Sequence, residues 1–380
     1  MPTIKSVRAI PLVAPLEETF GSARGWIRQR QHVLVRVELD DGTQGYGECW
    51  GPVAGTREAI DALIGPSLVG RDPLETTVIW DELTYRLRWA YHGFVPYSAV
   101  SGVDIALWDV KGKLLGEPLY RLLGGQAVEG VRVYATGHYF APDRTPEEVI
   151  RLIVEEAVDN VERGFTAVKL KVGMTRLLGC DLRYDLELIG SVREAVGPDV
   201  AVMIDASCAL SYAEALRVAA VAAEHDVLWF EEPLDPDDLR GYERLAAASR
   251  VPLAAGESWT SVQPFAEALR RGAVAFVQPD VCVAGGITPV TRVAALARAA
   301  NVELAPHVWG TPICLAASLH LLCAEPRLSW LELDTTPDPI RDELLREPID
   351  VSPRSGVAVP EAPGLGIEID QATLEHYEQA

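Results

Sequence analysis

The sequence lacks the patterns that place a chain in or across a membrane. No run of about 18 consecutive apolar residues occurs, which is the length that a membrane-spanning helix needs. The first twenty residues contain no basic cluster followed by a long apolar run. We therefore expect no signal peptide, no membrane partner and a cytoplasmic location.

Cysteine pairs and nucleotide-binding glycines are also missing. The six cysteines are scattered and form no C-x-x-C pair, so we expect reduced and mostly buried thiols. No G-x-G-x-x-G follows an apolar strand pattern, which argues against a dinucleotide site.

Positive charge is scarce. Lysine and arginine total 34 against 55 acidic residues, which gives a formal net charge of −21. Such a field repels nucleic acids, so we expect none as a partner. It repels small anions too, so a site for an acidic substrate must carry its own cations.

The length of 380 residues suits a barrel of about 250 residues plus a smaller unit. Within residues 1–128, His32–Leu39 alternates in hydrophobicity and ends in Asp-Asp-Gly, and Gln44–Glu48 returns as the partner of a hairpin. Helical patterns then cover residues 57–65, 74–89 and 98–115. These residues therefore predict an α+β unit.

Residues 129–346 alternate between short apolar runs and amphipathic stretches. The runs, eight in number, cover residues 131–136, 167–172, 200–205, 227–232, 251–257, 273–280, 302–307 and 328–333. Eight parallel strands can close a barrel, although an open doubly wound sheet is the alternative. Residues 347–380 are rich in proline and glycine, and we expect them to return and pack on the first unit.

Carboxylates stand at the ends of three successive predicted strands. Asp205, Glu231 and Glu257 are each separated by 26 residues, which is one strand-helix unit. They should therefore meet at the mouth of the barrel, where barrel enzymes build their sites. A hard divalent cation would relieve their repulsion, and we expect Mg²⁺, with Mn²⁺ as a substitute. The alternative is three acids that are solvated or paired with arginine.

Two lysines share one face of the second predicted barrel strand. Lys169 and Lys171 are two residues apart, so both should point into the barrel with Ala167. We expect two neighbouring ammonium groups to lower each other's pKa, and Lys171, nearer the strand end, to serve as a base.

Asp280 and His307 end the sixth and seventh predicted strands. A carboxylate on one imidazole nitrogen fixes the tautomer and leaves the other nitrogen to exchange protons. A lone histidine is more often structural, but the position of this one matches the acids. A cation, a lysine and a histidine together suit removal of a proton next to a carboxylate through an enediolate.

These motifs resemble the enolase superfamily, mandelate racemase subgroup. The resemblance rests on K-L-K (169–171), M-I-D-A (203–206), F-E-E-P (230–233), G-E (256–257), Q-P-D (278–280) and H-V-W-G (307–310). It implies a (β/α)₇β TIM-like barrel under an N-terminal α+β capping domain that the C-terminal segment completes. It also implies that Glu332 supports the enediolate, and that loops around residues 17–30 and 49–56 close over the substrate.

The C-terminal third is similar to the branch with galactarolactone and 3,6-anhydrogalactonate cycloisomerases. This resemblance implies β-elimination from an acid sugar or its lactone, by a cycloisomerase or a dehydratase. A two-base racemase or epimerase is the alternative, and a non-catalytic sugar-acid binding protein is a remote one. A hydrolytic metal barrel would want an H-x-H after the first strand, which is missing. We expect Arg24 and Trp309 to contact substrate and the chain to form a homo-oligomer.

Overall fold

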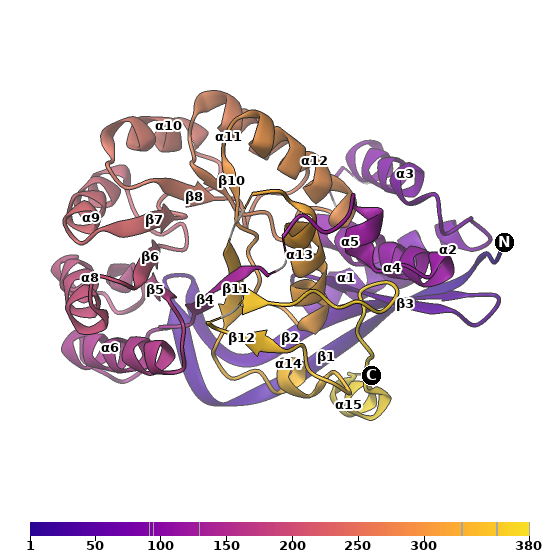
Figure 1. Ribbon diagram of the computed structural model, residues 1–380, viewed down its shortest axis with the longest axis horizontal. Coiled ribbons are helices and arrows are strands. Elements are labelled where there is room, and N and C mark those ends of the chain that lie inside the picture. The colour runs from indigo at the N-terminus through magenta and orange to yellow at the C-terminus, as the bar shows by residue number, and fades with distance from the viewer. Residues whose placement is uncertain (91, 94, 129, 328–329, 355, 380) are drawn as a thin grey trace.

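The computed structural model describes residues 1–90, 92–93, 95–128, 130–327, 330–354 and 356–379. A three-stranded sheet with its helices stands beside an eight-stranded barrel that is surrounded by helices (Figure 1). Two long strands of the sheet run along the barrel and bring residues from near the N-terminus to it. This arrangement confirms the expected barrel with a separate N-terminal unit.

The N-terminal sheet is antiparallel, in the order β1 (Ile4–Ser22), β2 (Gly25–Leu39) and β3 (Gln44–Cys49). The predicted hairpin is confirmed by β2 and β3, with Val35 opposite Gly47. The prediction of a loop around residues 17–30 is wrong, because most of that segment is the far end of a β1–β2 hairpin whose turn is Ala23-Arg24. Polar residues there obscure the alternation that identifies a strand.

Helices cover one face of this sheet. They are α1 (Val53–Glu58), the π-helical turn η1 (Ala59–Ile64), α2 (Gly65–Leu68), α3 (Thr76–Trp89) and α4 (Tyr97–Leu115), after which α5 (Leu119–Leu122) packs against α4 and α13. Helix α4 lies so close to β3 that a Cβ on Gly47 would sit 1.9 Å from the carbonyl oxygen of Gly102. Two of the three predicted helices are therefore confirmed, whereas residues 57–65 divide between α1, η1 and α2.

The barrel strands are parallel, and each lies within one predicted run except β11, which extends one residue beyond its run. They are β4 (Arg132–Thr136), β5 (Ala167–Lys171), β6 (Ala201–Asp205), β7 (Val227–Glu231), β8 (Leu253–Ala255), β9 (Phe276–Val277), β10 (Glu303–Leu304) and β11 (Trp330–Asp334). Residues 328–329 of the last run lie outside the described residues. Strand β11 pairs with β4, and no described pairing joins β10 to β11, so the barrel is nearly closed.

Apolar side chains fill the barrel below its mouth. One buried cluster joins inward residues of several strands, among them Tyr134, Ala167, Met203 and Trp229. Val168 and Leu170 belong instead to the core beneath the surrounding helices. The period of two therefore holds in β5, and the lysines that alternate with these residues face inward, above a packed floor.

The helices around the barrel complete the strand-helix repeat. They are α6 (Pro146–Glu162), α7 (Met174–Leu177), α8 (Arg183–Val196), α9 (Tyr212–Glu224), α10 (Leu239–Ala248), α11 (Gln263–Arg271), α12 (Ile287–Ala299), α13 (Pro312–Ala324) and α14 (Pro339–Glu343). Among the described residues, no helix has both the length and the apolar character needed to cross a membrane.

The C-terminal segment returns to the N-terminal unit, as expected. It contains β12 (Val351–Ser352), β13 (Gly356–Val357) and α15 (Gln371–Tyr377). The Gln379 N–H donates to the Pro11 carbonyl oxygen at 2.9 Å, and the Leu365 N–H donates to the Asp109 carboxylate at 2.8 Å. The domain boundaries after residues 128 and 346 stay predictions.

Candidate active site

Three buried carboxylates converge at the mouth of the barrel. Asp205 and Glu231 are the last residues of β6 and β7, and Glu257 follows β8 by two residues. One oxygen from each lies within 4.8 Å of the others. The second oxygen of Glu257, Oε2, is buried and makes no hydrogen bond with a described residue, and its polar neighbour is His307 Nε2 at 3.3 Å. This set of hard oxygen donors fits a divalent cation such as Mg²⁺ or Mn²⁺.

Each of these carboxylates has a cationic neighbour from the chain. Lys171 Nζ contacts Asp205, Lys169 Nζ lies 2.5 Å from Glu231 Oε1, and Arg24 Nη2 lies 2.7 Å from Glu257 Oε1. The two lysines come from β5, whereas Arg24 comes from the turn between β1 and β2. The charge of the triad is therefore offset by groups from both halves of the chain.

Lys169 lowers the pKa of Lys171, as expected, but the expectation that the net pKa of Lys171 is lowered is wrong. Burial lowers the pKa of Lys171, but the Asp205 carboxylate and other neighbours outweigh it and raise the pKa above its ordinary value. Burial lowers the pKa of Lys169 as well, but Glu231 and Glu332 outweigh burial, so that the pKa lies well above its ordinary value. The prediction counted the two ammonium groups but left out the carboxylates on neighbouring strands.

The predicted aspartate–histidine pair lies together on the other side of the mouth. His307 Nδ1 is 2.7 Å from Asp280 Oδ2, and His307 Nε2 is 3.3 Å from Glu257 Oε2. Burial lowers the pKa of His307, but Glu257, Glu332 and Asp280 raise it to about 10. The imidazole is therefore protonated on both nitrogens at neutral pH, with Nε2 directed toward the triad.

Glu332 stands on β11 between these groups. Its Oε1 lies 2.7 Å from Lys169 Nζ, and its Oε2 accepts a hydrogen bond of 2.9 Å from the Val308 N–H. Burial raises the pKa of Glu332, but Lys169 and His307 lower it to about 2. This carboxylate is therefore ionised and links β5 to the strand end that carries His307.

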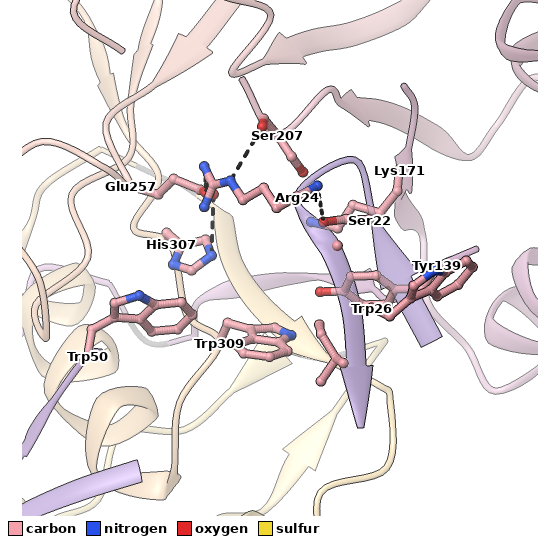
Figure 2. A pocket seen from close by; sticks show the side chains of 12 residues that line it. Ser22, Arg24, Trp26, Trp50, Tyr139, Lys171, Ser207, Glu257, His307 and Trp309 are labelled. Carbon is pink, nitrogen blue, oxygen red and sulfur yellow. Dashed lines mark hydrogen bonds and ion pairs between the residues drawn. The ribbon is translucent and has the colours of Figure 1, made fainter. Parts of the chain in front are cut away.

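A pocket of about 190 Å³ opens above the triad, with Lys171 and His307 on opposite sides (Figure 2). Glu257 and Arg24 lie at one edge. Aromatic walls come from Trp26, Trp50, Tyr139 and Trp309. The pocket thus places a lysine and an imidazole on either side of a small ligand.

The two predicted substrate contacts, Arg24 and Trp309, both line this pocket. The Trp309 Nε1–H is buried and has no acceptor among the described residues. Sequence reasoning missed Trp26, Trp50 and Tyr139. Trp50 directly follows β3, and Tyr139 closely follows the first barrel strand, so their positions at strand ends were the available signal.

Comparison with known proteins agrees with this geometry. Residues 152–373 match the family model described as enolase C-terminal domain-like. Residues 5–124 match the N-terminal domain of the mandelate racemase / muconate lactonizing enzyme family. The chain belongs to the enolase superfamily.

Relatives of this superfamily member cover nearly its full length. It is 38% identical to a D-galactarolactone cycloisomerase of Agrobacterium fabrum, over 98% of each chain. It is 32% identical to an arabinonate dehydratase of Saccharolobus solfataricus, over 91% of this chain and 90% of the other. The crystal structure of the 3,6-anhydro-D-galactonate cycloisomerase from Zobellia galactanivorans superimposes with a TM-score of 0.88, at 36% identity and complete coverage of both chains. The predicted family is confirmed, and the chain is an enzyme of the superfamily.

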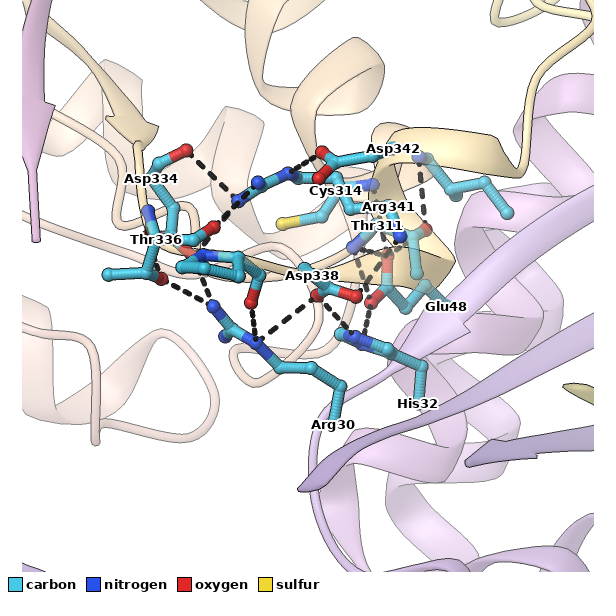
Figure 3. Close-up of polar contacts among 12 residues, drawn as sticks. Arg30, His32, Glu48, Thr311, Cys314, Asp334, Thr336, Asp338, Arg341 and Asp342 are labelled. Atoms are coloured by element: carbon cyan, nitrogen blue, oxygen red, sulfur yellow. Dashed lines mark hydrogen bonds and ion pairs between the residues drawn. The ribbon is translucent and has the colours of Figure 1, made fainter. Parts of the chain in front are cut away.

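In this enzyme, a buried polar network joins the long hairpin to the barrel (Figure 3). His32 on β2 lies 3.1 Å from Glu48 and 3.0 Å from Asp338. Glu48 accepts hydrogen bonds from the N–H and hydroxyl of Thr311 at 2.9 and 2.7 Å. Thr311 caps helix α13, which begins a few residues after His307. The network therefore fixes the hairpin against the segment that carries one side of the pocket.

Arg30 extends this network toward the pocket. Its guanidinium lies 2.9 Å from the Asp334 carboxylate and 4.2 Å from the centre of the Trp309 ring. A cation against an aromatic face at this distance is attracted by the ring and holds its orientation. Residues far apart in the sequence thus set the position of one pocket wall, which is why periodicity did not reveal them.

Proposed function

We propose that this enzyme removes the proton α to the carboxylate of an acid sugar or sugar lactone and then expels the oxygen on the β-carbon. The observation that supports this proposal most directly is that Lys171 and His307 lie on opposite sides of one pocket, beside the acid triad. The cycloisomerase and dehydratase relatives support this substrate class, since both names denote reactions of sugar acids or their lactones.

We propose that Asp205, Glu231 and Glu257 hold Mg²⁺, for which Mn²⁺ can substitute. When bound there, the ion stabilises the negative charge that develops on the substrate carboxylate as the α-proton leaves. Lys169 and Glu332 lie directly beside this region and beside each other. Lys169 contributes a fixed positive charge, and Glu332 keeps that lysine in place.

Lys171 accepts the α-proton on one side of the substrate. Lys171 must be neutral before it can accept this proton, so its ion pair with Asp205 must first be weakened. On the other side, His307 Nε2 donates its proton to the departing β-oxygen, while Nδ1 keeps its own proton, which is hydrogen-bonded to Asp280. The α C–H and β C–O bonds break, and a C=C bond forms. Loss of water makes the enzyme a dehydratase, and opening of a ring makes it a cycloisomerase.

Racemisation or epimerisation is the second candidate, because proton-exchanging groups flank the pocket on both sides. Reaction in D₂O separates the two. A racemase returns a deuterium to the α-carbon of the inverted acid, whereas elimination yields a 2-keto-3-deoxy acid. A non-catalytic binding protein would produce neither product.

The decisive experiment is a panel of acid sugars and their lactones, incubated with the protein and Mg²⁺ and followed by NMR. We expect turnover of at least one compound, loss of turnover with EDTA, and recovery on adding Mg²⁺ or Mn²⁺. Lys171→Ala should also abolish turnover. Its control is Lys5→Ala, which removes an exposed lysine of the N-terminal sheet whose ion-pair partner among the described residues is Glu38. Turnover that persists after complete chelation would contradict the proposal.

We also propose that the enzyme works in the cytoplasm as a homo-oligomer. Tyr85 and Trp89 on α3 support the assembly, since their side chains are large, apolar and exposed on one helix. Light scattering after size exclusion tests it, and a monomeric mass at micromolar concentration would contradict it.

A further inference from the structure

Arg24 joins the tip of the N-terminal hairpin to the acid triad. Its Nη2 lies 2.7 Å from Glu257 Oε1 and 3.2 Å from the Ser258 hydroxyl, and its Nε donates to the Ser207 carbonyl oxygen at 3.4 Å. Nη2 also contacts Cys208 Sγ at 3.3 Å. The guanidinium therefore reaches the loop that follows Asp205 at the end of β6 and the loop after β8 that contains Glu257.

The three cations beside the triad differ in their freedom to move. The side chains of Lys169 and Lys171 are 0% and 7% exposed and rise from the middle and end of a barrel strand. The side chain of Arg24 is 43% exposed and belongs to the two-residue turn between β1 and β2. Only Arg24 can leave its carboxylate without unpacking the barrel.

The hairpin itself stays docked when the Arg24 side chain moves. Gly21 and Phe140 exchange two backbone hydrogen bonds of 2.9 and 2.8 Å just below the turn. These bonds hold the end of β1 against the loop after β4. A rotation of one long side chain is therefore enough to break the contact with Glu257.

We propose that Arg24 competes with the divalent cation for Glu257, so that binding of the ion releases the guanidinium into the pocket. The inference rests on the proposed function, in which Glu257 is a metal ligand. A guanidinium 2.7 Å from Glu257 Oε1 repels a second cation on the same carboxylate and occupies one of its lone pairs. Once released, Arg24 lines the pocket as a free cation that an anionic substrate meets after the metal. The enzyme therefore binds metal first and substrate second.

Metal titration of the full-length protein tests the competition. Mn²⁺ binding is followed by the loss of the free-ion EPR signal, in the wild type, Arg24→Gln and Arg28→Gln. Arg28 is the matched control, because it is an exposed arginine of the same hairpin and makes no ion pair with any described residue. We expect the Mn²⁺ dissociation constant to fall about three- to tenfold in Arg24→Gln and to stay unchanged in Arg28→Gln. Equal or weaker binding in Arg24→Gln overturns the inference.

Chemical modification by phenylglyoxal offers a second readout, since the reagent needs only a free guanidinium and no opening of the backbone. Mass spectrometry after brief treatment should show faster modification of Arg24 with Mn²⁺ than without it, with modification of Arg28 as the internal reference. Modification of Arg24 that slows or stays constant contradicts the release. If the wild type binds no Mn²⁺, or if Glu257→Gln binds it normally, the metal assignment itself fails. That result is distinct from a failure of the competition alone.

Discussion

Lys171 illustrates how the neighbours of a single side chain decide its chemistry. Its ammonium group is buried and contacts Asp205, which raises its pKa. His307, opposite, is held protonated by Glu257, Glu332 and Asp280. The two groups are therefore not interchangeable: one must lose a proton to act as a base, and the other already carries the proton of an acid.

Substitution of these two residues should separate proton removal from elimination. Lys171→Ala should lose both turnover and exchange of the substrate α-proton with D₂O, by about 10²- to 10⁴-fold. His307→Asn should lose turnover to a similar extent but retain the exchange, because the base on the other side remains. NMR of the recovered substrate measures both. Exchange that survives in Lys171→Ala and vanishes in His307→Asn would reverse the two roles.

Trp309 provides a test of substrate contact that spares the chemistry. Trp309→Phe keeps an aromatic face over Arg30 but removes the Nε1–H, which has no acceptor among the described residues. We expect KM to rise about three- to tenfold with little change in kcat, since one hydrogen bond to substrate is lost. Steady-state kinetics and a thermal melt on the same sample measure this. An unchanged KM would show that the indole N–H does not touch substrate.

The principal site residues could be predicted from the sequence because each stands at the end of an apolar run. Asp205, Glu231 and Glu257 follow one another at a constant interval, and Lys171 shares its strand face with Lys169. Trp26 and the Arg30–His32 network could not be predicted in this way. They belong to the β1–β2 hairpin, and its approach to the barrel in space has no counterpart in sequence spacing.

Secondary structure was predictable to the extent that one face of each element is apolar. All the barrel strands were found, although β9 and β10 are reduced to two residues each. The tip of the β1–β2 hairpin was missed because its side chains face the ligand pocket on one side, where polar and aromatic residues mix, and solvent on the other. A strand in such surroundings has no apolar alternation to detect.

The contact between β2 and the barrel should make stability depend on pH. Burial lowers the pKa of His32, but its hydrogen bonds to Asp338 and Glu48 raise it to about 9. A raised pKa means that protonated His32 stabilises the fold fully below about pH 6.5, and that this stability is lost as the pH rises through 9. The loss amounts to about 3 kcal/mol for a shift of this size.

Melting temperatures between pH 6 and pH 9.5 test this dependence. We expect the wild type to melt at a markedly lower temperature at the high-pH end. His32→Gln should start lower at pH 6 and fall less across the same range, while His307 contributes equally in both proteins. Parallel curves for the two proteins would assign the pH dependence to other groups.

For the molecule as a whole, the net charge of −21 opposes the approach of an anionic substrate. The Debye length falls from about 30 Å at 0.01 M salt to about 8 Å at 0.15 M, so added salt screens this repulsion. We expect kcat/KM for an acid-sugar anion to rise about threefold over that range, at saturating Mg²⁺. A lactone without a free carboxylate is the control and should show no rise. A fall in kcat/KM for the anion would mean that the local cations dominate at long range.

The pocket walls Trp26 and Trp50 and the side chain of Arg24 reach the barrel from the N-terminal unit, whereas the acid triad, Lys171 and His307 belong to the barrel. Part of the pocket wall and all of the proposed reactive groups are thus carried by separate stretches of backbone. Evolution can retune the first by changing a short hairpin turn while the reactive groups stay intact, and protein engineers can graft turns from relatives to redirect the same catalyst to new sugars.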